Sequence, residues 1–302
     1  MTLTEMRYII ALAREKHFGR AASLCHVSQP ALSVAINKLE NELGVLIFER
    51  YRNEVKITDV GQQIITQAQR ILDEAAKIKI IANSKQSQLH TPLKIGAIYT
   101  VGPYLFPMII PKLKKIARAM PLLIQEGFTA DLKEKLLQGE LDVIFISLPF
   151  SESGMVIKTL YDEPFVILLP QDHALNKKQN ISIAELEGEE ILLLGEGHCF
   201  RKQVIEACPH CYRDHASQRA IEGTSLETLR YMVASGMGIT ILPSTAANSP
   251  FSSNKLCTKP FKGKPPKRTI ALVWRASFTR PKAITALIEA LKISTLHGVC
   301  LL

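Results

Sequence analysis

Long apolar segments are missing from this sequence of 302 residues. No run reaches the roughly 18 consecutive apolar residues that a membrane-spanning helix needs, so we expect no contact with a membrane. The first residues, 1–7, lack the basic start and the apolar centre of a secretory signal peptide. We therefore expect a cytoplasmic protein. In that reducing compartment the six cysteines are not expected to form a structural disulfide framework.

A concentrated positive charge is missing from the N-terminal part, although the whole chain carries a net charge of +9. Residues 1–60 contain eight Lys/Arg and seven Asp/Glu, which leaves a net of +1. The charge total by itself therefore does not identify a nucleic-acid-binding protein. The composition, 47% hydrophobic and 22% charged, is that of a globular protein, and the length allows two or three domains.

The first 60 residues show the pattern of a helix-turn-helix. Segment 1–16 has the apolar spacing of an amphipathic helix, and 18–24 predicts a second, short helix. A tight turn leads to Ser28, a favourable N-cap residue, and Gly44 ends the helix that follows. The alternating segment 48–58 then predicts a β-hairpin wing.

In such a module the second helix of the motif enters the major groove of DNA, where its N-terminal residues read base edges. Short polar and amide side chains on that helix can reach bases or the backbone, and arginines of the wing can reach phosphates. We therefore expect double-stranded promoter DNA as a partner. The expected contact residues are Ser28, Gln29, Pro30, Ser33, Asn37, Lys38, Arg50 and Arg52.

A heptad repeat follows the wing. Its apolar residues recur at alternating steps of four and three, which is the spacing of a coiled-coil seam. A long helix cannot bury such a seam alone, so we expect it to pair with a second copy; packing against the chain's own body is the alternative. The polar segment 83–92 predicts a hinge. The seam consists of Ile57, Gly61, Ile64, Ala68, Ile71, Ala75, Ile78 and Ala82.

From residue 93 onward, short strand patterns alternate with helix patterns. This alternation is typical of an α/β fold with mostly parallel sheets. The expected strands are 93–98, 122–126, 141–147, 165–169, 190–194, 238–242 and 269–274, and the expected helices are 104–119, 130–138, 226–235 and 281–294.

Polar residues follow three of the expected strands. Ligands of open α/β sheets bind beyond the carboxyl ends of the strands. Thr100, Thr129, Gly197 and His198 lie at such ends, and their polar groups could hold a small molecule next to Cys199. Taken singly, each threonine is more often a helix cap than a ligand.

Cys199 is expected at the N-terminus of a helix over 200–207. The helix dipole and the unpaired N–H groups there favour the thiolate, which is the reactive form of cysteine. An inert, buried thiol is the alternative.

A second cysteine motif, Cys208-Pro209-His210-Cys211, lies directly after this helix. Its spacing allows a disulfide within the motif, or a metal site completed by His210 or His215. A single such pair is a weak metal signal, so we predict no metal and no cofactor.

The N-terminal motifs resemble the winged helix-turn-helix of LysR-type transcriptional regulators. The matching residues are Phe18-Gly19-Arg20-Ala21-Ala22, Val27-Ser28-Gln29-Pro30-Ala31-Leu32-Ser33, Ile36-Asn37-Lys38-Leu39-Glu40, Leu43-Gly44-Val45 and Phe48-Glu49-Arg50. The resemblance implies an α/β fold class with an N-terminal all-α winged helix-turn-helix, a long linker helix and a regulatory domain of two subdomains, like periplasmic binding proteins. It also implies a bacterial protein, a dimer or homotetramer, and contact with RNA polymerase.

The resemblance implies limits for these parts. Residues 1–58 would be the DNA-binding domain, 59–90 the dimerising linker helix and hinge, and 91–302 the regulatory domain. Within the regulatory domain, subdomain I would comprise 91–161 plus 269–302, and subdomain II would comprise 162–268.

Within that family the chain is similar to the peroxide-sensing regulators. The residues that carry this similarity are 100–105, 197–201, Cys208, 224–229 and 238–240. The similarity implies that hydrogen peroxide oxidises Cys199 to a sulfenic acid and that Cys208 condenses with it to a disulfide. It also implies that the peroxide is positioned by Thr100, Thr129, Gly197 and His198.

This pairing would have a structural consequence. An unbroken helix would hold the Cα atoms of Cys199 and Cys208 about 13 Å apart, whereas a disulfide needs them within about 7 Å. Oxidation would therefore have to reshape the segment. Arg201 and Cys211 are candidate modulators; Arg201 could stabilise the thiolate or be surface charge. Lys202 departs from the acid that these regulators often carry.

The alternatives to peroxide sensing are metabolite binding and peroxidase activity. The cleft between the subdomains could bind a small metabolite, as elsewhere in the family. A thiol peroxidase is the enzymatic alternative, but the winged head and the heptad helix argue against it, so we expect no enzyme.

Overall fold

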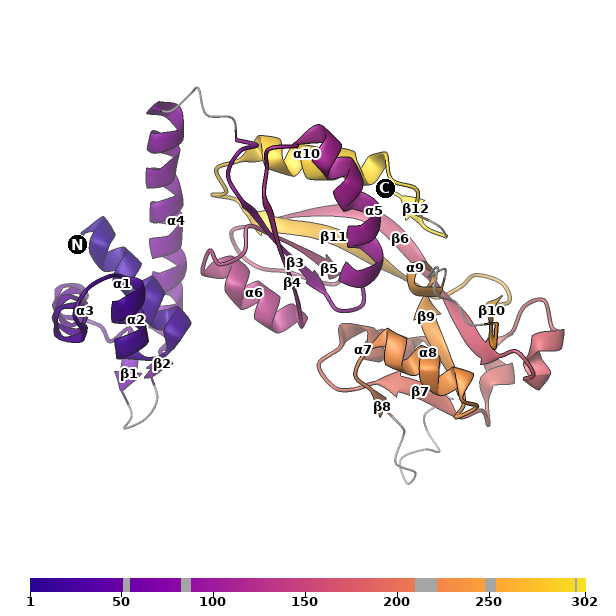
Figure 1. The fold of residues 1–302 in the computed structure, drawn as a ribbon. Coiled ribbons are helices and arrows are strands. Elements are labelled where there is room, and N and C mark those ends of the chain that lie inside the picture. Colours follow the sequence, from indigo (N-terminus) through magenta and orange to yellow (C-terminus); the bar gives the residue numbers. More distant parts are fainter. Residues whose placement is uncertain (51–54, 83–87, 210–221, 248–253, 297) are drawn as a thin grey trace.

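The computed structural model describes residues 1–50, 55–82, 88–209, 222–247, 254–296 and 298–302 (Figure 1). Arg52, Cys211, His210 and His215, which the sequence suggested as site residues, lie outside this described part.

The head of the molecule, residues 1–57, contains three helices and a two-stranded wing. Its elements are α1 (Leu3–Glu15), α2 (Phe18–Leu24), α3 (Gln29–Leu43), β1 (Phe48–Arg50) and β2 (Val55–Ile57). Local signals explain the helix ends. The Ser28 hydroxyl accepts a hydrogen bond from the Ala31 N–H, and Gly44 ends α3 with φ of +69°. The predicted helix-turn-helix and hairpin are confirmed.

The linker helix α4 (Asp59–Ala82) packs its first half against this head. Ala68 of the predicted seam is buried there beside Ile65, and a Cβ at Gly61 would collide with the carbonyl group of Ile47. Ile78, further along the seam, is 69% exposed. The chain's own head therefore covers part of the seam, and pairing through the rest of α4 stays a prediction.

The remaining chain forms a long curled sheet with helices on its faces. Its strands are β3 (Leu93–Ile98), β4 (Leu122–Gly127), β5 (Val143–Ser147), β6 (Met155–Pro170), β7 (Ile191–Leu194), β8 (Glu222–Gly223), β9 (Ile239–Pro243), β10 (Leu256–Pro260), β11 (Lys267–Arg275) and β12 (Cys300–Leu301). Its helices are α5 (Gly102–Ile116), α6 (Thr129–Leu137), α7 (Cys199–Ala207), α8 (Leu226–Ala234), α9 (Ser244–Ala247) and α10 (Pro281–Lys292), with short 3₁₀ turns η1 (Ala174–Lys177) and η2 (Ile183–Leu186).

The sheet is mixed, so the expectation of mostly parallel sheets is wrong. Parallel pairing occurs within each half, where β3 pairs with β4 and β5, and β7 pairs with β8 and β9. The long strands between the halves run antiparallel: β11 pairs with β5 and β6, and β6 pairs with β9. The expected strand 165–169 is only the end of β6, whose first half is largely exposed and lacks a buried apolar run.

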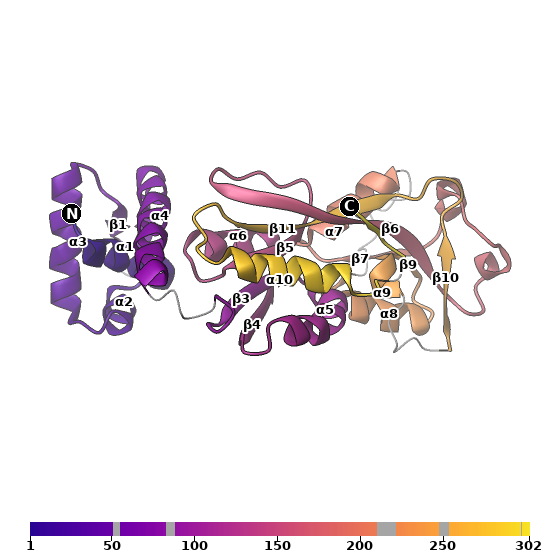
Figure 2. The ribbon, with the colours of Figure 1, turned by 90° about the horizontal axis from the view of Figure 1, so that it is seen from above.

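Two hydrophobic cores lie along this sheet. The first core gathers residues of β3, β5, β11, α5, α6 and α10, and the second gathers residues of β7, β9, α7 and α8. Strand β6 contributes Tyr161 to the first core and Phe165 to the second. Figure 2 shows the head and the two halves in a row. The domain limits expected from the sequence stay predictions.

Among the helices of the described ranges, none combines the length and the apolar character that a membrane crossing would require.

Candidate functional site

Helix α7 carries the two cysteines that the sequence singled out, one at each end. Cys199 is its first residue, after the N-cap His198, and Cys208 is its C-cap. The half-buried Cys199 packs against the first core, whereas Cys208 is fully buried in the second. Both are thiols. The nine-residue spacing along a regular helix separates their Cα atoms by about 13 Å, so the helix holds them beyond disulfide distance.

Three rings enclose the turn before Cys199. The His198 ring lies 4.9 Å from the ring of Phe128 and 5.9 Å from that of Tyr99, with edge-to-face geometry. Gly197 has φ of +91°, and a Cβ there would come within 3.0 Å of the Phe128 ring. Glycine is therefore required at 197 for both its backbone and its space.

His198 is polar but partly withdrawn from water. Its Nε2 lies 3.2 Å from the carbonyl oxygen of Thr224. Burial lowers the pKa of His198, and the hydrogen bond to Thr224 opposes this effect in part. A neutral imidazole at neutral pH follows, with Nε2–H as the donor to Thr224.

Two buried polar atoms near the start of α7 have no hydrogen-bond partner within the described part of the chain. They are the Thr129 hydroxyl and Oε1 of Gln203. Gln203 lies one turn after Cys199, and its Nε2 donates to Ser147 Oγ at 2.9 Å and to the Leu148 carbonyl at 3.2 Å. Buried polar atoms without partners are uncommon in folded proteins and suit a small polar ligand.

Thr100 is held by a buried arginine that the sequence did not single out. Arg268 donates from Nη1 to the Thr100 hydroxyl at 2.8 Å and from Nη2 to its carbonyl at 2.9 Å. Arg268 also pairs with Glu163 at 2.7 Å, and both side chains are 0% exposed. Its guanidinium lies 5.0 Å from the centre of the Phe200 ring. The partners of Arg268 lie far from one another in sequence, and no local sequence pattern predicts these contacts.

Arg201 anchors α7 to the neighbouring strands. Its Nη1 donates to the Leu194 carbonyl at 2.7 Å and to Glu222 at 2.6 Å. Lys202 is exposed, and its Nζ lies 3.8 Å from Glu206. Within the described ranges, no three His, Cys, Asp or Glu side chains gather as a metal site would need.

Most of the expected DNA-contact residues lie on α3 or directly before it. Ser28, Gln29, Pro30, Asn37 and Lys38 are exposed along α3, and Ser33 is half-buried between them.

Arg50 of the wing folds back over this helix. It hydrogen-bonds Asn37, its Nη1 lies 3.5 Å from Ser33 Oγ, and its guanidinium lies 4.8 Å from the centre of the Phe18 ring. The structure therefore brings Arg50 of β1 next to Ser33 and Asn37 of α3.

Glu40 is a second residue that the sequence did not assign. It is 5% exposed, and its Oε1 accepts hydrogen bonds from the N–H groups of Ile47 at 2.8 Å and Phe48 at 3.0 Å. Glu40 thus fixes where the wing begins relative to α3.

Comparison with known proteins matches both halves of the chain. Residues 3–62 match the family "Bacterial regulatory helix-turn-helix protein, lysR family", and residues 86–294 match "LysR substrate binding domain". A hydrogen peroxide-inducible genes activator of Dickeya chrysanthemi is 39% identical over 91% of this chain and 90% of its own. The DNA-binding transcriptional dual regulator OxyR of Escherichia coli K12 is 37% identical over 97% of this chain and 95% of its own.

Solved structures of similar proteins cover nearly the whole chain. A full-length cysteine-to-aspartate variant of OxyR from Pseudomonas aeruginosa has a TM-score of 0.87 and 50% identity, over 99% of this chain and 98% of its own. A cysteine-to-serine mutant of Corynebacterium glutamicum OxyR, solved with hydrogen peroxide bound, has a TM-score of 0.64 and 30% identity, over 96% and 91%. This chain therefore belongs to the LysR family of bacterial transcription regulators, and within it to the group of hydrogen peroxide-inducible genes activators that includes OxyR.

Proposed function

We propose that this chain is a DNA-binding transcription regulator that senses hydrogen peroxide through a reversible disulfide between Cys199 and Cys208. One observation carries the proposal: α7 holds the two thiols at opposite ends and in different hydrophobic cores. Forming the bond therefore has to unwind part of α7 and withdraw at least one of the two thiols from its core. The similarity to peroxide-inducible activators supports the same conclusion.

The chemistry proceeds in two balanced steps. The Cys199 thiolate attacks one peroxide oxygen, an S–O bond forms, the O–O bond breaks, and the leaving hydroxide takes a proton to become water. The Cys208 thiolate then attacks the sulfenic acid sulfur, so that the S–S bond forms, the S–O bond breaks and a second water leaves. Two thiols lose two electrons and one peroxide gains them.

The surrounding residues position the peroxide in this proposal. Because the Thr100 oxygen already accepts from Arg268, its own O–H remains available as a donor. The hydroxyl of Thr129 is buried and has no partner among the residues that the structure describes, so it can donate to the leaving oxygen. Gly197 and His198 shape the turn on the other side.

The other parts of the chain take the roles that the family implies. Residues 1–58 bind promoter DNA, 59–90 pair two copies, and 91–302 sense the signal. The assembled protein is a homotetramer that recruits RNA polymerase in the bacterial cytoplasm, and it turns over no substrate as an enzyme. The proposed DNA contacts are Ser28, Gln29, Pro30, Ser33, Asn37, Lys38, Arg50 and Arg52.

Peptide mapping after a brief micromolar peroxide pulse tests this function. We expect a Cys199–Cys208 cross-link in the native protein and in a Cys257→Ser control. Cys208→Ser should stop at a sulfenic acid on Cys199, and Cys199→Ser should lose the response. A cross-link between Cys208 and Cys211 with Cys199 unmodified would refute the proposal.

A further inference from the structure

A buried ion pair fastens the linker helix to the regulatory half of its own chain. Nε of Arg275, on β11, donates to the carboxylate of Asp73, on α4, at 3.0 Å. The Ser277 hydroxyl donates to the same oxygen at 2.6 Å, and Gln69 donates to the other at 2.9 Å. The side chains of Arg275 and Asp73 are only 7% and 13% exposed. A charge so far withdrawn from water depends on its partner.

Arg275 also binds the end of α6. Its Nη1 donates to the carbonyl oxygen of Leu136 and, at 2.8 Å, to that of Leu141. Leu136 lies in the last turn of α6, where carbonyl groups lack partners within the helix and a cation is favoured. One guanidinium therefore joins the C-terminal end of α6 to the linker helix.

The opposite end of α6 touches the turn that precedes Cys199. Phe128 is the N-cap of α6, and its ring contacts His198 and would lie 3.0 Å from a Cβ at Gly197. Helix α6 is nine residues long and spans about 13 Å. It therefore contacts the start of α7 at one end and, through Arg275, Asp73 at the other.

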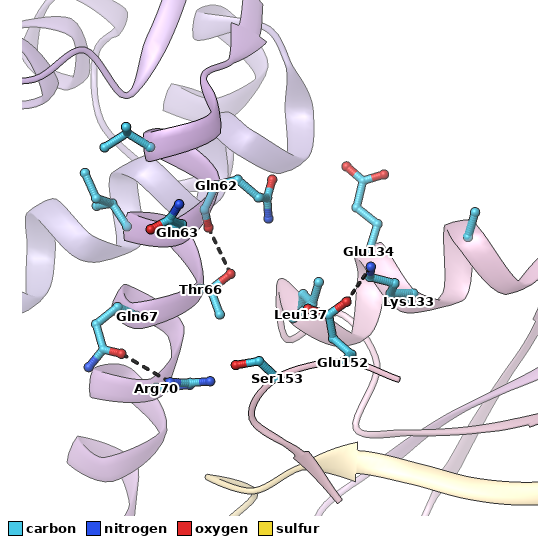
Figure 3. A pocket seen from close by; sticks show the side chains of 13 residues that line it. Gln62, Gln63, Thr66, Gln67, Arg70, Lys133, Glu134, Leu137, Glu152 and Ser153 are labelled. Carbon is cyan, nitrogen blue, oxygen red and sulfur yellow. Dashed lines mark hydrogen bonds and ion pairs between the residues drawn. The ribbon is translucent and has the colours of Figure 1, made fainter. Parts of the chain in front are cut away.

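An open cleft of about 840 Å³ separates the first half of α4 from α6. Figure 3 shows that none of the interactions drawn among the cleft residues crosses the cleft. Arg70 forms a hydrogen bond with Gln67 within α4, and Lys133 pairs with Glu152 within the regulatory half. The pair Arg14–Glu140, at 2.9 Å and with side chains 44% and 19% exposed, joins α1 and not α4 to the regulatory half. The linker helix is thus held near Asp73 and not along its length.

We propose that α6 and the Asp73–Arg275 pair couple the redox state of α7 to the position of the linker helix. This inference rests on the proposed function. With both thiols reduced, Gly197 and His198 pack on Phe128, and α6 keeps Arg275 in place for Asp73. Disulfide formation unwinds α7, withdraws this packing, shifts α6 and breaks the ion pair. The linker helix and the head it carries are then released to a new orientation on DNA.

Distance measurements by pulsed electron spin resonance test the coupling. Ketone-bearing amino acids at the exposed positions Asn41 and Lys158 carry the spin labels, so the cysteines stay untouched. Mixing with excess unlabelled protein removes signals between copies. Reduced native protein should give one distance population, and oxidised protein a displaced one. Reduced Asp73→Asn should already populate the displaced distance without peroxide.

Two further variants guard against a simple loss of folding. Asp59→Asn makes the same substitution at an exposed position in the first turn of α4 and should keep the native distance. Ser277→Ala removes only one hydrogen bond from Asp73 and should give an intermediate population. The coupling is overturned if reduced Asp73→Asn keeps the native distribution.

Peptide mapping of the same oxidised samples separates the two ideas. A mapped Cys199–Cys208 disulfide with an unchanged distance would overturn the coupling and leave the sensing function intact. If the disulfide itself is missing, the sensing function is wrong, and the reduced variants alone decide whether Asp73 and Arg275 hold the linker helix.

Discussion

The hydroxyl group of Tyr104 donates a hydrogen bond of 3.0 Å to Glu227 and so joins α5 to α8 across the two halves of the regulatory region. Burial and the neighbouring carboxylate raise the pKa of Tyr104, so the hydroxyl keeps its proton and acts as the donor. This bond, the contacts of Arg268 and the hydrogen bonds that Gln203 donates to Ser147 and Leu148 are polar ties between the half that contains Thr100 and the half that contains α7.

Replacing Tyr104 by Phe should lower the free energy of unfolding by about 1 kcal/mol, because one hydrogen bond is lost while water can still reach the half-exposed Glu227. Urea titration of the reduced protein measures the change. Tyr231→Phe is the matched control, since Tyr231 is 71% exposed. Equal losses in both variants would contradict a tie at Tyr104.

Gly197→Ala should both destabilise the protein and slow Cys199 oxidation. The left-handed backbone costs a residue with a Cβ about 1–2 kcal/mol, and the new methyl group must also displace the Phe128 ring. Gly188→Ala is a close control, because Gly188 has φ of +85° with nothing within 4 Å of an added Cβ. Urea titration and stopped-flow oxidation should show the larger effect at Gly197. Identical effects would mean that the contact with Phe128 is irrelevant.

Stability should fall as pH drops below 6.5, in part through His198. Burial lowers the pKa of His198 from its usual value of 6.5, so below that pH the unfolded chain binds a proton that the folded chain does not. The loss grows until the pH reaches the folded pKa. His198→Gln should flatten this part of the curve, whereas a change at the exposed His90 should leave it in place. Unfolding midpoints at a series of pH values give the answer.

Arg50→Ala should weaken DNA binding by about 1.5 kcal/mol, or roughly tenfold in Kd, if Arg50 bonds a phosphate. The slope of log K against log salt should fall by about 0.9. Arg50→Lys keeps the charge and should keep the slope, although it loses the planar fork that also reaches Ser33 and Asn37. Anisotropy titrations at several salt concentrations distinguish these cases; an unchanged slope in Arg50→Ala would rule out the phosphate contact.

The head was predictable because its signals are local. Ser28 and Gly44 mark the ends of α3 within a few residues, and both act in the structure as the sequence indicates. The turn into α7 was predictable for the same reason, since Gly197 and Pro209 flank the helix.

Contacts between distant residues could not be predicted in this way. Arg268 and Thr100 are 168 positions apart, and a charged residue such as Arg268, just before the expected strand 269–274, normally indicates an exposed position. The first half of β6 was missed because its exposed residues lack the apolar run that marks a buried strand. Its role depends on pairing with β11, which lies far along the chain.

The complete burial of Arg268 and Glu163 affects which kind of signal can change the conformation of the regulatory region. A clamshell movement of the two lobes would pull Arg268 away from Thr100 or from Phe200, while Glu163, which faces it on the adjacent strand, would stay paired with it. The loss of these contacts opposes an opening and closing of the two lobes around a soluble metabolite. In the proposed function the signal is a covalent bond instead, so it persists after the oxidant has gone and ends only when a reductant breaks the disulfide.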